Sequence, residues 1–116
     1  MASTNQAAAT NSTPPQFQKL TGSWIRPDGG YLLEIRSADS SGVLDAAYFN
    51  PSPIHVAKAV ALRDGAATHV FIELQDEGYP GCTYTLTYDP AADWLTGDYY
   101  QAAQREHYNI VFSRKP

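Results

Sequence analysis

Apolar and polar residues alternate along most of the chain after Phe17, and aromatic and β-branched residues are frequent there. A period of two predicts β-strands with one buried face, because successive side chains of a strand point to opposite sides. No segment keeps a helical period for three turns. The alanine-rich part of His55–Leu62 is ambiguous, and Val56 and Val60 favour a strand there. The expected strands are Leu20–Arg26, Tyr31–Ala38, Leu44–Asn50, His55–Arg63, Thr68–Gln75, Thr83–Tyr88, Trp94–Ala102 and Glu106–Arg114.

Short segments rich in Gly, Pro and Asp separate the expected strands. The clearest is Pro27-Asp28-Gly29-Gly30, in which the glycine pair supplies the positive φ of a tight hairpin. Asn50–Pro53 and Glu77–Gly81 are expected to interrupt pairing, since proline cannot donate to a β-ladder. Eight strands with such connections predict an up-and-down meander, and closure removes its exposed edges. The predicted fold is therefore all-β, a single eight-stranded antiparallel barrel.

Residues 1–16 differ from the rest of the chain because they carry no charged side chain and no apolar run. We expect a disordered, dispensable polar tail over 1–16 and one β-barrel domain over 17–116. Tails of this composition are typical of bacterial envelope proteins after a cleaved export signal. A cytosolic protein with a loose tail would have the same composition, so a periplasmic location is only slightly favoured over a cytoplasmic one.

Charge and cysteine content narrow the function classes. The 116 residues contain 8 basic and 12 acidic side chains, a net charge of -4, and the basic residues are scattered singly. This argues against nucleic acid and anionic membrane surfaces as partners. No run of 18 apolar residues occurs, so no transmembrane segment is expected. The single Cys82 excludes an internal disulfide and a cysteine-cluster metal site.

No catalytic motif stands out. The sequence has no nucleophile elbow, P-loop, Gly-x-Gly-x-x-Gly or His-Glu-x-x-His pattern. The three histidines, His55, His69 and His107, lack the spacing of metal ligands. We therefore predict no enzyme activity, no metal and no cofactor.

A short motif recurs along the chain. Leu20-Thr21-Gly22-Ser23-Trp24 returns as Leu95-Thr96-Gly97-Asp98-Tyr99, with a looser echo in Leu44-Asp45-Ala46-Ala47-Tyr48. A glycine in mid-strand lets a sheet bend sharply while a neighbouring ring fills the space opposite. For Trp24, this favours a packing role over ligand contact.

These motifs carry a resemblance to a known family. Gly22-Ser23-Trp24, the Gly42, Leu44 and Tyr48 set, and Trp94–Tyr99 are similar in order and spacing to motifs of the calycin barrels. The avidin-like subgroup is the most similar and the lipocalins come second. The resemblance covers about residues 20–115 and implies a barrel with a central cavity.

The same resemblance argues against biotin as the ligand. The avidin-like site places a polar side chain two residues after the first-strand Trp, where this chain has Arg26. Tyr48 and the polar Asn50 match the third-strand positions. The tryptophans expected on the fifth and eighth strands are absent from residues 70–74 and 109–112.

The candidate binding residues are mainly tyrosines. Threonines alternate with Tyr84 in residues 83–88 and suit a wet outer wall, so Tyr84 is expected to point inward. The same alternation places Tyr48 and Tyr99 on inward faces, with Asn50 at the rim. Trp24 is a further candidate despite its expected packing role.

Glu73 is the last candidate. If Phe71 points inward, Glu73 is a buried carboxylate that faces the ligand. If Val70, Ile72 and Leu74 point inward instead, Glu73 is exposed to solvent. The second alternative is favoured, because carboxylates are rarely buried.

The sequence predicts a non-catalytic module that binds a small amphipathic ligand in a tyrosine-lined barrel. The alternative is a structural or protein-interaction domain with a filled barrel and no ligand. Homodimerisation stays open in both cases.

Overall fold

A computed structural model describes residues 14–116. The expected tail lies mostly outside the described residues, but Pro15 and Gln16 belong to a short helix, α2 (Pro15–Gln18), so the folded part begins before the predicted boundary. The strands are β1 (Gly22–Arg26), β2 (Tyr31–Ala38), β3 (Leu44–Phe49), β4 (Pro53–Ile54), β5 (Val56–Asp64), β6 (Ala67–Asp76), β7 (Tyr79–Asp89), β8 (Trp94–Gln101) and β9 (Glu106–Arg114).

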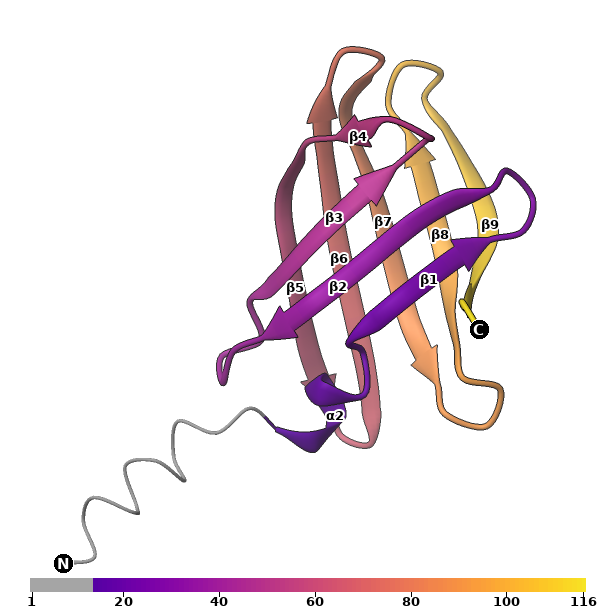
Figure 1. Cartoon of the computed structure of the whole chain (residues 1–116). Coiled ribbons are helices and arrows are strands. Elements are labelled where there is room, and N and C mark those ends of the chain that lie inside the picture. Colours follow the sequence, from indigo (N-terminus) through magenta and orange to yellow (C-terminus); the bar gives the residue numbers. More distant parts are fainter. Residues whose placement is uncertain (1–13) are drawn as a thin grey trace, which may run out of the picture.

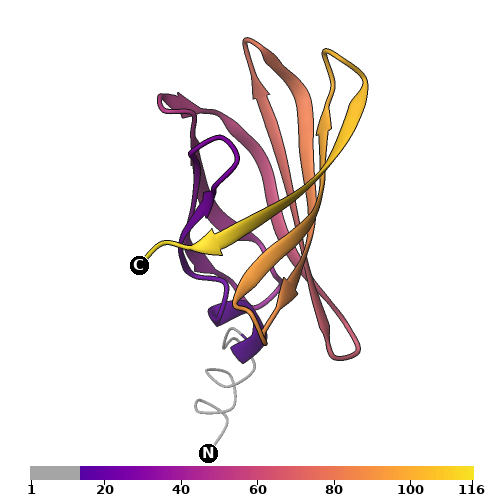
Figure 2. The ribbon, with the colours of Figure 1, turned by 90° about the vertical axis from the view of Figure 1, so that its right-hand side faces the viewer.

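The strands form one antiparallel sheet that curls into a nearly closed barrel (Figures 1 and 2). The order is β4-β3-β2-β1-β9-β8-β7-β6-β5, so the first long strand pairs with the last, through Trp24↔Arg114 and Ile25↔Ser113. Closure on the other side rests on one bridge, Val43↔Val60, and a 2.6 Å backbone hydrogen bond from Ala61 to Gly42. The all-β fold is confirmed as an antiparallel barrel.

The number of strands was predicted wrongly, because β4 makes the sheet nine-stranded. It comes from the proline-containing segment that was expected to interrupt pairing. Pro53 pairs with Phe49 of β3, and β4 lies at an end of the strand order. An edge strand needs hydrogen bonds on one side only, so a residue without an N–H group is tolerated there.

The second expected interruption is also shorter than predicted. Pairing of β6 with β7 continues through Gln75↔Pro80 and Asp76↔Tyr79, with an irregularity that absorbs Gly81 (φ 81°). This bulge carries Tyr79 into the sheet at the end of the barrel.

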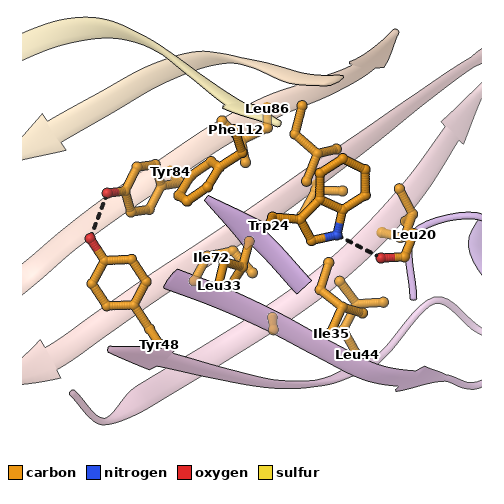
Figure 3. Close-up of a cluster of buried hydrophobic side chains, with 14 of the residues drawn as sticks. Leu20, Trp24, Leu33, Ile35, Leu44, Tyr48, Ile72, Tyr84, Leu86 and Phe112 are labelled. Atoms are coloured by element: carbon orange, nitrogen blue, oxygen red, sulfur yellow. Dashed lines mark hydrogen bonds between the residues drawn. The ribbon is translucent and has the colours of Figure 1, made fainter. Parts of the chain in front are cut away.

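The interior of the barrel is filled by side chains, with large rings at its centre (Figure 3). The repeated motif contributes all of its aromatic residues to this core, because Trp24, Tyr48 and Tyr99 are buried as alternation predicts. The Trp24 indole N–H donates to the Leu20 carbonyl at 2.9 Å. Phe17 of α2 is buried in the same core, so the helix covers the end of the barrel seen at the bottom of Figure 1.

A charged cluster joins β9 to the segment between α2 and β1 near the helix-covered end. Arg114 donates both to the Asp93 carboxylate, at 2.9 Å, and to the Thr21 carbonyl, at 2.6 Å. Its guanidinium lies 4.1 Å from the centre of the Trp24 ring. Hydrogen bonds from Arg114 and Tyr88 lower the pKa of Asp93 to about 2.

Gly97→Val should destabilise the barrel. A Cβ at Gly97 would lie 2.1 Å from the Thr85 carbonyl oxygen of the neighbouring strand, so the two backbones would have to separate. We expect the free energy of unfolding in urea to fall by about 1–3 kcal/mol. Thr96→Val, at the adjacent position on the outer wall, is the control and should change it by less than about 0.5 kcal/mol. Equal stability of the two variants would contradict the packing role of Gly97.

Asp93→Asn should reduce the loss of stability in acid. Because the folded-state pKa of Asp93 is below the ordinary 3.8, its contribution is present above that value and is lost as the pH falls towards about 2. Asparagine keeps the positive φ of this position accessible. Urea unfolding between about pH 5 and about pH 2 should therefore show a weaker pH dependence in the variant.

The control is Asp45→Asn, because the Asp45 carboxylate is exposed and has no hydrogen bond or ion pair within residues 14–116. It should keep the wild-type pH profile, and a profile equally flat in both variants would contradict the role of Asp93.

Candidate functional site

A buried arginine lies at the end of the barrel opposite α2. Arg26 is the last residue of β1, and only 7% of its surface is exposed. Its Nε and Nη2 donate to the two carboxylate oxygens of Asp28 at 2.8 and 2.6 Å, and its Nη1 donates to the Tyr84 hydroxyl at 2.7 Å. Burial favours loss of the proton, but the hydrogen bonds to Asp28 and Tyr84 outweigh it and raise the pKa of Arg26. The site therefore holds a permanent cation.

The hairpin turn between β1 and β2 positions this ion pair. The N–H groups of Gly29 and Gly30 donate to the Arg26 carbonyl at 3.3 and 2.8 Å, which folds Asp28 back beside the guanidinium. Gly30 has a φ of 69°, a conformation that glycine adopts without strain. The hydrogen bond from Arg26 lowers the pKa of Asp28, so the pair stays ionised at neutral pH.

Three tyrosine rings surround the guanidinium. Its central carbon lies 4.5 Å from the ring centre of Tyr31, 5.2 Å from that of Tyr99 and 5.8 Å from that of Tyr84. Such distances allow attraction between the cation and the ring faces. The rings thus hold the guanidinium in one place, with Asp28 at its edge.

Below Arg26, a second hydroxyl extends the network into the core. The hydroxyl oxygens of Tyr48 and Tyr84 are 2.7 Å apart, and Figure 3 shows them meeting at one end of the core. Burial raises the pKa of Tyr84 to about 12 and raises that of Tyr48 further. Both phenols are therefore neutral hydrogen-bonding groups at physiological pH.

Above Arg26, a cleft of about 340 Å³ opens to solvent. Its volume is at the small end of the range for ligand pockets. Its lining combines aromatic rings with amides and the ion pair, drawn from β1, β2, β7, β8, β9 and the turns between them. The lining residues are Arg26, Asp28, Tyr31, Tyr79, Tyr99, Gln101, Gln104 and Tyr108.

Side-chain hydrogen bonds fix the rim of this cleft. Asn50, just after β3, donates to the hydroxyl of Tyr79, the first residue of β7. Gln101 donates to the Tyr99 hydroxyl at 3.3 Å. The Tyr108 hydroxyl donates to Gln104 at 2.8 Å. The polar groups of the rim are therefore held in defined positions before any ligand arrives.

The structure brings together most of the residues that the sequence singled out. Tyr48, Tyr84 and Tyr99 point inward and meet, with 4.6 Å between the ring centres of Tyr84 and Tyr99. Asn50 lies at the rim. Trp24 is fully buried and does not line the cleft, in agreement with its expected packing role.

Glu73 does not belong to this group. Val70, Ile72 and Leu74 fill the core, so Glu73 faces the outer wall of β6. In the register of the two strands, it lies opposite Lys58 of β5. The alternative of an inward Glu73 is therefore wrong, because three apolar side chains gain more from burial than one carboxylate.

Sequence reasoning missed the two residues at the centre of the site. Arg26 entered only as a mismatch to the avidin-like pattern, and Asp28 only as a turn residue. Arg26 shares the alternation of Trp24, which could have placed it on the inner face. Its contact with Tyr84, 58 residues away, has no signal in the sequence.

Within residues 14–116, no three His, Cys, Asp or Glu side chains are grouped so that they could hold a metal ion. None of the helices described there is long and apolar enough to cross a membrane.

Comparisons with models of known families, with curated proteins and with solved structures find no match to this chain. Function is therefore inferred from the geometry of the cleft.

Tyr84→Phe should destabilise the fold, although the volume of the side chain changes little. The variant removes the hydroxyl that links Arg26 to Tyr48 and leaves two buried polar groups without that partner. We expect the free energy of unfolding to fall by about 1–3 kcal/mol. Tyr100→Phe is the control, because the Tyr100 hydroxyl has no hydrogen bond in the described part of the chain. A Tyr84→Phe variant as stable as Tyr100→Phe would show that the network contributes nothing to folding.

Proposed function

We propose that this protein is a non-catalytic binding module of the calycin-like kind, which holds a small amphipathic ligand in the cleft above Arg26. The observation that carries the proposal is the contrast between the two ends of the barrel. One end is covered by α2 and packed with apolar side chains. The other places a buried cation and several tyrosines at the base of a 340 Å³ cleft. In a purely structural barrel, apolar residues of similar volume would fill this end equally well, since a buried charge costs desolvation energy.

The ligand would sit at the mouth of the barrel and not deep inside it. Tyr48, Tyr84 and Phe112 fill the interior below the guanidinium. Tyr99 reaches the cleft from β8, and Tyr31 and Tyr108 supply ring faces at its sides. Tyrosines suit such a site because a ring offers apolar contact and a hydroxyl offers one directed hydrogen bond. Biotin stays disfavoured, because a fixed Arg26–Asp28 pair lines the cleft.

The second candidate function is a protein-interaction domain with no ligand. The observation in its favour is a groove of about 510 Å³ on the outer wall of β5 and β6, lined mainly by apolar atoms of Val60, Leu62 and Phe71. Leu62 is 61% exposed there. Exposed apolar surface of this kind is common at interfaces, but single exposed residues are also normal on monomers.

A fragment screen distinguishes the two functions. The full chain is mixed with neutral, anionic and cationic one-ring aromatic compounds, and binding is followed by ¹H–¹⁵N NMR. We expect hits to shift the signals of Arg26, Tyr99 and Gln101. Signals confined to β5 and β6, or no shifts with any compound, would contradict the binding module.

A matched pair of variants tests whether the hits bind in the cleft. Gln104→Trp puts a large ring at the rim of the cleft and should weaken the hits by about tenfold or more, because it occupies the ligand's space. Ala103→Trp adds the same ring to the same turn but does not line the cleft, and it should leave binding unchanged. Equal effects of both variants would contradict the assignment of the cleft.

A further inference from the structure

We infer that the cleft selects an uncharged planar ligand that presents a carbonyl oxygen to the guanidinium of Arg26. This inference rests on the proposed function and names the chemical class of its ligand. Three observations carry it: an excess of hydrogen-bond donors, a charge that is already neutralised, and a lining rich in aromatic rings.

The buried network has more donors than acceptors. A guanidinium carries five N–H groups, and Arg26 uses three of them for Asp28 and Tyr84. The other two have no acceptor among the described residues. Tyr48 and Tyr84 add two hydroxyl hydrogens, of which their mutual hydrogen bond uses one. Because Arg26 lines the cleft, its remaining donors favour a ligand with an oxygen acceptor.

The charge of Arg26 is already matched within the protein. Asp28 binds the guanidinium through both oxygens, so the pair has no net charge. An anionic ligand would approach Arg26 beside the Asp28 carboxylate, which also lines the cleft, and would be repelled by it. A cationic ligand would meet the guanidinium itself. A neutral acceptor satisfies the donors without either repulsion.

The aromatic rings that line the cleft favour a flat molecule. Tyr31 lies against the guanidinium, and Tyr99 and Tyr108 are stacked with 6.3 Å between their ring centres. Ring faces bind other rings well in offset or edge contacts. A volume of about 340 Å³ accommodates only a small ligand. A one-ring aromatic amide combines these requirements, with its ring against the tyrosines and its carbonyl towards Arg26.

Three probes of the same size separate the ligand classes. Benzamide, benzoate and benzylamine share one ring and differ in charge. Each is titrated into the full chain while the Arg26 Nε–H signal and the amide signals of the cleft are followed by NMR. We expect benzamide to bind about fivefold or more tightly than the other two and to shift the Arg26 signal. A preference for benzoate or benzylamine at the cleft would overturn the inference while leaving the binding module intact. No shift with any probe would contradict both.

Asp28→Asn tests the role of charge directly. The variant keeps an oxygen acceptor beside Arg26 but removes the neutralising carboxylate, so benzoate should gain about tenfold and overtake benzamide. Glu34→Gln is the matched control, because Glu34 accepts from Arg36 two residues away on the outer wall, at 2.9 Å. It should leave the order of the probes unchanged. Benzamide preference that survives in Asp28→Asn, or a reversal in both variants, would overturn the inference.

Discussion

The curling of the sheet back onto itself is the constraint on which the rest of this structure depends. A hydrogen bond of 2.6 Å from Ala61 to Gly42 and the bridge Val43↔Val60 join β5 to the segment just before β3 near α2. Only glycine allows this approach, because a Cβ at position 42 would lie 2.2 Å from the Ala61 carbonyl oxygen. Because the sheet is closed, it has one inner face, and the side chains on that face pack together in one core.

The closed sheet divides the chemistry of the molecule along the barrel axis. Near α2, the core is apolar, and the Arg114–Asp93 pair joins β9 to the turn before β8. At the other end, Arg26 and the tyrosines replace apolar packing with hydrogen bonds. Large buried side chains, among them Trp24, Tyr84 and Phe112, pack between these ends. Recognition, in the function proposed above, is therefore a property of the mouth and of the turns that surround it.

The Arg26 network illustrates how a small barrel tolerates a buried charge. Removal of a guanidinium from water is unfavourable, and the cost is offset only where the partners are well placed. Here the hairpin turn supplies Asp28, and β7 supplies Tyr84 from across the barrel. Both partners hold the cation in place through hydrogen bonds. The same contacts that make the network tolerable also fix the position of Arg26, which lines the cleft, and such preorganisation favours binding.

The sequence by itself determined the β-class, the hairpin turn after Arg26 and the inward direction of Tyr84, because alternation and turn chemistry are local properties. It could not determine which face of a strand is buried when both carry apolar residues, and the side of Glu73 was decided by the core around it. Tertiary structure alone decided that Pro53 joins the sheet as an edge strand and that Tyr79 reaches the rim. Contacts across a closed barrel depend on strand neighbours far apart in sequence, and no local pattern records them.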